Sequence, residues 1–226
     1  DDPRLKPGPD GVEPNVGTLL GVAIAPERVL VDVDVEHVEG FDPRPVVAAL
    51  LPRTAFGFGR ASNPGSHAFY TVGQPIASLT CQDVDGTMLL ELRCLKKDLS
   101  PGRQTMVPPS VHPNGEAIEL WDGVGDPAHV PDLEHRWRLA AAALIATRNL
   151  GARELKHDQR LVLAAWLLQR DITEPDVVLL MRAIAAATGN DVADAELATR
   201  TSAQRVAGRQ PVKTHLKAVF GDAHRA

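Results

Sequence analysis

The chain has 226 residues, of which 44% are hydrophobic and 23% are charged, so it is long enough to bury a core and should form one domain plus a smaller one. No apolar run approaches the roughly 18 residues that a membrane-spanning helix needs, and no charged-then-apolar leader opens the chain. We therefore expect a cytoplasmic protein with no membrane partner. The net charge of −5 divides unevenly, with −8 over residues 1–130 and +3 over residues 131–226. The second part is the better candidate to meet a phosphate backbone.

Two kinds of pattern follow one another along the chain. Pro, Gly and Asp fill Asp1–Gly17, which predicts a loop. Short apolar segments then predict strands near residues 20–25, 28–35, 54–58, 67–72, 87–94, 104–107 and 117–121, with one helix near 43–51. From Pro131 the apolar residues recur at helical spacing, which predicts helices over 133–150, 157–169, 175–188 and 194–207, with a shorter one near 212–220. The sequence thus predicts an α+β protein with a strand-rich domain over residues 1–125 and an all-α bundle over residues 126–226.

Three acidic residues within apolar strands are the most informative feature. Asp32 and Asp34 alternate with valines in Val29–Val35, and Glu91 lies in the apolar run Met88–Arg93. Because alternate side chains of a strand share a face, Asp32 and Asp34 point the same way, and their repulsion is costly unless a cation lies between them. Hard, oxygen-preferring Mg²⁺ or Mn²⁺ suits such a cluster, and a third carboxylate would allow two ions. The alternative is an ordinary solvent-facing strand edge.

Two polar segments add candidate ligand contacts. A Gly/Ser/Pro-rich loop runs from Phe56 to His67, and its Arg60 and His67 could contact phosphate oxygens, although a plain hairpin loop with a capping histidine explains it as well. The second segment, Gln104–Glu116, contains three prolines that would stiffen the loop presenting Ser110 and His112. A proline-stiffened turn without function is the alternative here.

Two further sets of residues bear on metals and nucleic acid. Cys81 and Cys94 lack C-x-x-C or Cys/His spacing, so we expect buried thiols and neither zinc nor a disulfide framework. Basic residues recur every four positions near the C-terminus, which would place them on one face of a continuous helix, although Pro211 opposes that continuity. They are candidate single-strand DNA contacts, or else a solvated surface: Arg205, Arg209, Lys213 and Lys217.

The order of these motifs resembles a known family. An Asp-x-Asp pair, then Gly65-Ser66-His67, then Glu91, then Pro-Pro-Ser-Val-His-Pro-Asn-Gly over residues 108–115, is similar to the bifunctional primase/polymerase (prim-pol) branch of the archaeo-eukaryotic primase superfamily. The resemblance covers roughly residues 15–121. It implies a mixed, mostly antiparallel sheet with an RRM-like core, followed by a small helical domain that helps to engage template.

The resemblance also implies roles for individual residues. Two Mg²⁺ or Mn²⁺ ions would be held by Asp32, Asp34 and Glu91, and a nucleoside triphosphate (NTP or dNTP) would be the substrate. His67, with Ser66 of its motif, would contact the triphosphate. Further nucleotide contacts would come from Arg60, Gln104, Ser110 and His112. The partners would be a single-stranded DNA template and a primer.

Some features of the family pattern are missing. Only Asn15-Val16-Gly17 remains of the region that usually opens the domain, and the zinc-binding insert of some relatives is absent. No Gly-x-x-x-x-Gly-Lys-[Ser/Thr] motif occurs, so a separate helicase would have to unwind DNA. Two rival hypotheses stay open: a metal-dependent phosphodiesterase or nuclease, and a non-catalytic replication-initiation module that binds DNA.

Overall fold

The computed structural model describes residues 15–150, 155–170 and 172–211. Contacts divide the chain into two compact units. The first consists of residues 1–39, 52–82 and 88–134, and the second of residues 40–51, 83–87 and 135–226. In each unit only the described residues are considered below.

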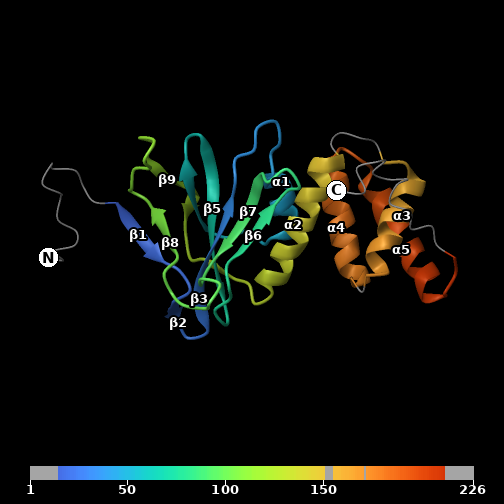
Figure 1. Ribbon diagram of the computed structural model, residues 1–226, viewed down its shortest axis with the longest axis horizontal. Coiled ribbons are helices and arrows are strands. Elements are labelled where there is room, and N and C mark those ends of the chain that lie inside the picture. The colour runs from blue at the N-terminus through green and yellow to red at the C-terminus, as the bar shows by residue number, and fades with distance from the viewer. Residues whose placement is uncertain (1–14, 151–154, 171, 212–226) are drawn as a thin grey trace, which may run out of the picture. The chain divides into compact units, whose positions relative to one another are not determined.

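The first unit is built from β-strands (Figure 1). Its strands are β1 (Val16–Leu19), β2 (Ala23–Ala25), β3 (Arg28–Val35), β4 (Phe56–Arg60), β5 (Asn63–Val72), β6 (Leu79–Gln82), β7 (Met88–Arg93), β8 (Gln104–Val107), β9 (Ile118–Val124) and β10 (Ala128–His129). The main sheet has the order β6-β7-β3-β5-β4-β9, with β2 beside β3 and β10 beside β5, while β1 and β8 form a separate pair. All these pairs are antiparallel except that of β10 with β5. The predicted α+β class with a mostly antiparallel sheet is therefore confirmed.

Strand β3 lies between β5 and β7 in the main sheet, and valines and acids alternate along it. Val31 and Val33 are buried on one face of the sheet, opposite Tyr70 of β5 and Leu92 of β7. The alternate residues of β3, Leu30, Asp32 and Asp34, point to the other face. That face carries a small apolar cluster formed by Leu20, Leu30, Phe58, Phe69, Val107 and Ile118. The polar site described below lies on this same face of the sheet.

The segment between β4 and β5 is a tight hairpin, so the expected long Gly/Ser/Pro loop is wrong. Its turn is confined to Ala61 and Ser62, and β5 begins at Asn63. A Cβ at Gly59 would lie 2.5 Å from the Asn63 carbonyl oxygen and 2.6 Å from the Gly65 nitrogen. The glycines therefore serve close approach of two strands rather than an open loop.

Three strands went unpredicted, namely β1, β6 and the two-residue β10. β1 begins at Val16, inside the segment expected to be a loop, and β6 is a short edge strand with two exposed residues. All three are short, with four, four and two residues, and so offer too few positions for a recognisable pattern.

The second unit is helical. Its helices are α1 (Arg44–Leu50), most of α2 (Leu133–Leu150), α3 (His157–Leu168), α4 (Glu174–Ala187) and α5 (Val192–Ala207). Helix α5 packs against α3 and α4, and α1 packs against α4. Thr173 and Asp191 are the N-caps of α4 and α5, accepting hydrogen bonds from the backbone N–H of Asp176 and Asp194. The helix expected near 212–220 lies outside the described residues.

A buried arginine ties α3 to α5. Arg160 is only 6% exposed, and its guanidinium donates to the carboxylate of Asp194 and, at 3.1 Å, to the side-chain oxygen of Asn190. His157 contacts the same carboxylate at 2.7 Å. Without that carboxylate, the buried positive charge of Arg160 would lack its counter-ion, which is costly.

Each compact unit contains three separate stretches of the chain. The domain boundary at residue 125/126 that we predicted from the change in sequence pattern concerns independently folding domains, and it stays a prediction. By contacts, α1 and the β6–β7 turn at Asp83–Thr87 belong with the helices. Within this helical unit, Arg148 donates to the carboxylates of Asp83 and Asp85, and Asn149 Nδ2 donates to Asp83 at 3.0 Å. The RRM-like core and the bundle arrangement stay predictions.

Candidate metal and nucleotide site

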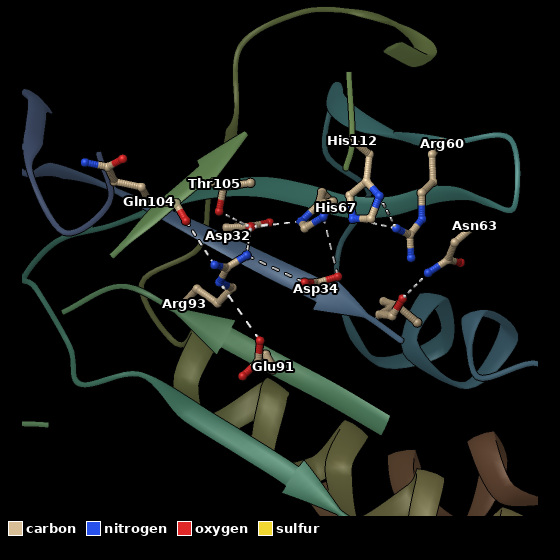
Figure 2. Close-up of polar contacts among 11 residues, drawn as sticks. Asp32, Asp34, Arg60, Asn63, His67, Glu91, Arg93, Gln104, Thr105 and His112 are labelled. Carbon is tan, nitrogen blue, oxygen red and sulfur yellow. Dashed lines mark hydrogen bonds and ion pairs between the residues drawn. The ribbon is translucent and has the colours of Figure 1, made fainter. Parts of the chain in front are cut away.

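Three neighbouring strands bring the predicted acids and histidine into one row. Asp34 of β3 lies opposite Glu91 of β7 and opposite His67 of β5. Two residues earlier on β3, Asp32 lies opposite Arg93 of β7. Residues paired across antiparallel strands point to the same face, so these five side chains share one surface of the sheet (Figure 2).

Among the described residues, Asp34, Glu36 and Glu91 form an acidic group that could hold a metal ion. One carboxylate oxygen from each lies within 4.8 Å of the others. Glu36 follows the last residue of β3, and sequence reasoning missed it although it continues the alternation begun by Asp32 and Asp34. An all-oxygen donor set of this kind fits Mg²⁺ or Mn²⁺.

Asp32 lies apart from that group and is fully buried. Its Oδ2 accepts hydrogen bonds from Thr105 Oγ1 at 2.7 Å and from His67 Nδ1 at 2.9 Å. Its Oδ1 is buried without a hydrogen-bond partner among the described residues. Because an unpaired buried carboxylate oxygen is costly, this atom also fits a site that binds a cation.

His67 is oriented from two sides. Its ring stacks on buried Phe58, with centroids 4.9 Å apart and an angle of 10° between the planes. Its Nε2 lies 3.7 Å from Asp34 Oδ1. Burial lowers the pKa of His67, but the charges of Asp32 and Asp34 and the hydrogen bond to Asp32 outweigh burial, so the pKa lies above its ordinary value.

For the pKa of Asp34, burial outweighs the effect of the neighbouring positive charges. Burial raises the pKa of Asp34 to about 7, with Asp32 and Glu36 adding to the effect while His67 and Arg93 oppose it. Without a bound cation, this carboxyl is therefore about half protonated at neutral pH. The positive charges of His67 and Arg93 thus do not fully offset burial and the repulsion from neighbouring carboxylates.

A cleft of about 330 Å³ opens beside the acids. It is lined by Asp34, Glu36, Gly59, Arg60, Asn63, Ser66, His67, Arg93, Gln104, Thr105, Met106, His112 and Ile118. Five of the six residues predicted to bind nucleotide are in this list. Sequence reasoning missed Arg93, Thr105 and Asn63, whose positions depend on strand pairing and not on any local motif.

Arg60 and His112 stand together on the cleft wall (Figure 2). Arg60 Nη1 lies 2.7 Å from His112 Nε2 and 3.0 Å from its Nδ1, and Nδ1 lies 2.8 Å from Asn114 Oδ1. Because a guanidinium can only donate, the imidazole accepts from Arg60. Glu116 then accepts from Asn114 Nδ2 at 2.6 Å and from Ser62 Oγ at 2.6 Å, which joins the two loops. The network fixes a cationic group in the same cleft as the acids.

Ser110, the sixth predicted nucleotide contact, does not line this cleft. It is 3% exposed, and its hydroxyl accepts from Val16 N at 2.7 Å and donates to Val16 O at 3.2 Å. Asn15 makes two hydrogen bonds of 2.9 Å with the backbone of Val111. The residues before and within β1 therefore anchor the proline-rich loop that carries His112.

The predicted DNA-binding face is only partly described. Arg205 and Arg209 are both exposed, whereas Lys213 and Lys217 lie outside the described residues. Helix α5 ends at Ala207, and Arg209 has a left-handed φ of 51°. The helix therefore stops between Arg205 and Arg209, so these two residues do not share one continuous helix.

Comparisons with family models, with curated proteins and with solved structures gave no match. Within the described part of the chain, no helix is both long and apolar enough to cross a membrane. Cys81 and Cys94, the two cysteines, are both buried. The functional conclusion consequently depends on the site.

Proposed function

We propose that this protein is a metal-dependent nucleotidyltransferase that extends or primes DNA on a single-stranded template, using nucleoside triphosphates. The observation that carries the proposal is the cleft itself. Its lining combines the carboxylates of Asp34 and Glu36, close to Glu91, with the guanidinium of Arg60 and its partner His112. Carboxylates that can hold divalent ions and a guanidinium that can pair with phosphates, in one cleft, are what phosphoryl transfer needs.

Asp34, Glu36 and Glu91 would hold the ions, and the unpartnered Oδ1 of Asp32 is a further donor. Bound Mg²⁺ or Mn²⁺ would supply charge neutralisation and a more acidic attacking hydroxyl. His67, held by Asp32 and Phe58, would donate a hydrogen bond to the triphosphate. Arg60 would pair with phosphate oxygens, and the cleft side chains would align a 3′ hydroxyl with the α-phosphorus as pyrophosphate leaves.

The proposal is tested by primer synthesis and primer extension on single-stranded DNA, with Mg²⁺ or Mn²⁺ and either ribo- or deoxynucleotides. Asp32→Ala and Glu91→Ala should reduce incorporation on the order of a thousandfold or more, because each removes charge from the site. Glu119→Gln, an exposed change on β9, is the matched control. Near-normal synthesis by either alanine variant, with the fold intact, would contradict the assignment.

The same assay separates the rival functions. A phosphodiesterase or nuclease would shorten labelled DNA in the presence of metal without needing any triphosphate. A non-catalytic initiation module would bind DNA and leave it unchanged under every condition. The template-dependent, triphosphate-dependent lengthening that we expect is distinct from both outcomes.

A further inference from the structure

Arg93 places a positive charge among the carboxylates of the site. Its Nη1 lies 3.8 Å from Asp32 Oδ2 and 3.7 Å from Asp34 Oδ2, and its Nε lies 4.0 Å from Glu91 Oε2. Its Nη2 donates to the backbone carbonyl oxygen of Gln104 at 2.9 Å (Figure 2). The guanidinium is thus held by β8 at a point that faces all three acids.

The contacts with the acids are long for an arginine. Charge-assisted hydrogen bonds between a guanidinium and a carboxylate are usually about 2.7–2.9 Å. Here every distance from Arg93 to an acid is at least 3.7 Å, and its buried Nε has no hydrogen-bond partner among the described residues. Arg93 therefore balances the negative charge without committing its donors to any one carboxylate.

Arg93 also lines the cleft, with its side chain 23% exposed. Its planar fork of donors suits the oxygens of a phosphate group. A divalent ion entering the acidic group would repel the guanidinium and would neutralise the carboxylates that attract it. The donors that lack a carboxylate partner would then be available to an anion in the cleft.

We propose that Arg93 is a resident counter-ion that competes with divalent metal for the carboxylates and pairs with the triphosphate once metal has bound. This inference rests on the proposed function and extends it to a residue outside the predicted motifs. It makes metal and nucleotide binding depend on Arg93 with opposite signs. A residue that only organised the carboxylates would support both kinds of binding in the same direction.

The test compares the wild type with Arg93→Gln, which removes the charge and keeps a donor for the Gln104 carbonyl. Mn²⁺ affinity is measured without nucleotide by calorimetry or electron paramagnetic resonance. The affinity for a non-hydrolysable nucleoside triphosphate is then measured at saturating Mn²⁺. Arg28→Gln, an exposed charge removal at the start of β3, is the matched control.

We expect Arg93→Gln to bind Mn²⁺ on the order of tenfold more tightly and the triphosphate on the order of tenfold more weakly. Arg93→Lys, which keeps the charge but loses the fork, should bind Mn²⁺ like the wild type and triphosphate less tightly. This second variant also replaces Arg93→Gln if that protein does not fold, as judged by circular dichroism.

Weaker Mn²⁺ binding by Arg93→Gln, or affinities equal to those of Arg28→Gln, would overturn the inference while leaving the proposed function in place. If Arg93→Gln does not fold, wild-type triphosphate affinity in Arg93→Lys overturns it as well. If the wild type itself binds no Mn²⁺, the proposed function fails and the inference fails with it. The wild-type measurement therefore separates the two failures.

Discussion

Replacing Glu36 with glutamine should change stability in opposite directions with and without a divalent cation. In the metal-free protein Glu36 lies within 4.8 Å of acidic oxygens from both Asp34 and Glu91. Two full charges at that separation repel by about 3.5 kcal/mol at an effective dielectric constant of about 20. Partial exposure and the nearby Arg93 reduce this repulsion. We therefore expect Glu36→Gln to raise the free energy of unfolding in EDTA by about 1 kcal/mol.

A gain of that size corresponds to a rise in melting temperature of about 2–4 °C for a protein of this length. With Mn²⁺ present the order should reverse, because a ligand that binds only the folded state stabilises it according to its affinity. Loss of one carboxylate from the group should weaken Mn²⁺ binding about tenfold, which removes about 1.4 kcal/mol of that stabilisation.

The assay is thermal unfolding followed by circular dichroism, in EDTA and in Mn²⁺, at about pH 8. This pH lies above the pKa of Asp34, about 7, so the carboxylates carry most of their charge. Glu119→Gln makes the same chemical change on exposed β9 and should leave both melting temperatures unchanged. If Glu36→Gln behaves like this control under both conditions, Glu36 is no part of a metal site.

Three further predictions concern other parts of the molecule. Asp194→Asn should lower the free energy of unfolding by about 3 kcal/mol, because buried Arg160 loses its carboxylate. Burial alone would raise the pKa of Asp194, but hydrogen bonds from basic neighbours outweigh it and lower the pKa, so its stabilisation is present above about pH 4 and is lost as pH falls through the folded pKa. Denaturant unfolding at neutral and acidic pH should show a smaller pH dependence in the variant. Gly59→Ala should lower the melting temperature and Gly73→Ala should not, because a Cβ would meet backbone atoms at 2.5 and 2.6 Å in the first case and nothing within 4 Å in the second. His112→Ala should weaken triphosphate binding about tenfold in calorimetry while Mn²⁺ affinity stays unchanged, because the imidazole fixes the guanidinium on the cleft wall.

Each of these has a clear contrary result. Equal acid sensitivity of wild type and Asp194→Asn would mean that the carboxylate does not stabilise the folded state through its charge. Identical melting temperatures for the two glycine variants would remove the argument from close strand approach. A loss of Mn²⁺ affinity in His112→Ala would place that residue with the metal ligands.

Local pattern predicted the centre of the site because the strand itself encodes it. The alternation of Asp32 and Asp34 with valines fixes their shared face, and the apolar run around Glu91 marks a strand. That Glu91 lies opposite Asp34 depends on the register between β3 and β7, which is a property of pairing. The sequence suggested the residues, and the sheet placed two of them together.

The remaining residues of the site required tertiary information. Arg93 and Thr105 belong to the site only because the tertiary fold brings them beside Asp32. Glu36 joins the acids just after the end of β3. The place of Ser110 depends on tertiary contacts in the same way: its local motif fits a ligand contact, yet its hydroxyl is hydrogen-bonded to the backbone of Val16, far away in sequence. Composition likewise predicted a loop where Gly59 permits a hairpin.

Helix α1 has a practical consequence for anyone dissecting this protein into fragments. Its residues Val46, Val47 and Leu50 are buried, and the helix packs against α4, although it is encoded between two strands of the first unit. A fragment ending near residue 125 would retain α1 but lack α4, and it would expose apolar surface that promotes aggregation. Poor expression of such a fragment would report a lost packing partner and say nothing about catalysis, so activity should be measured on the complete chain.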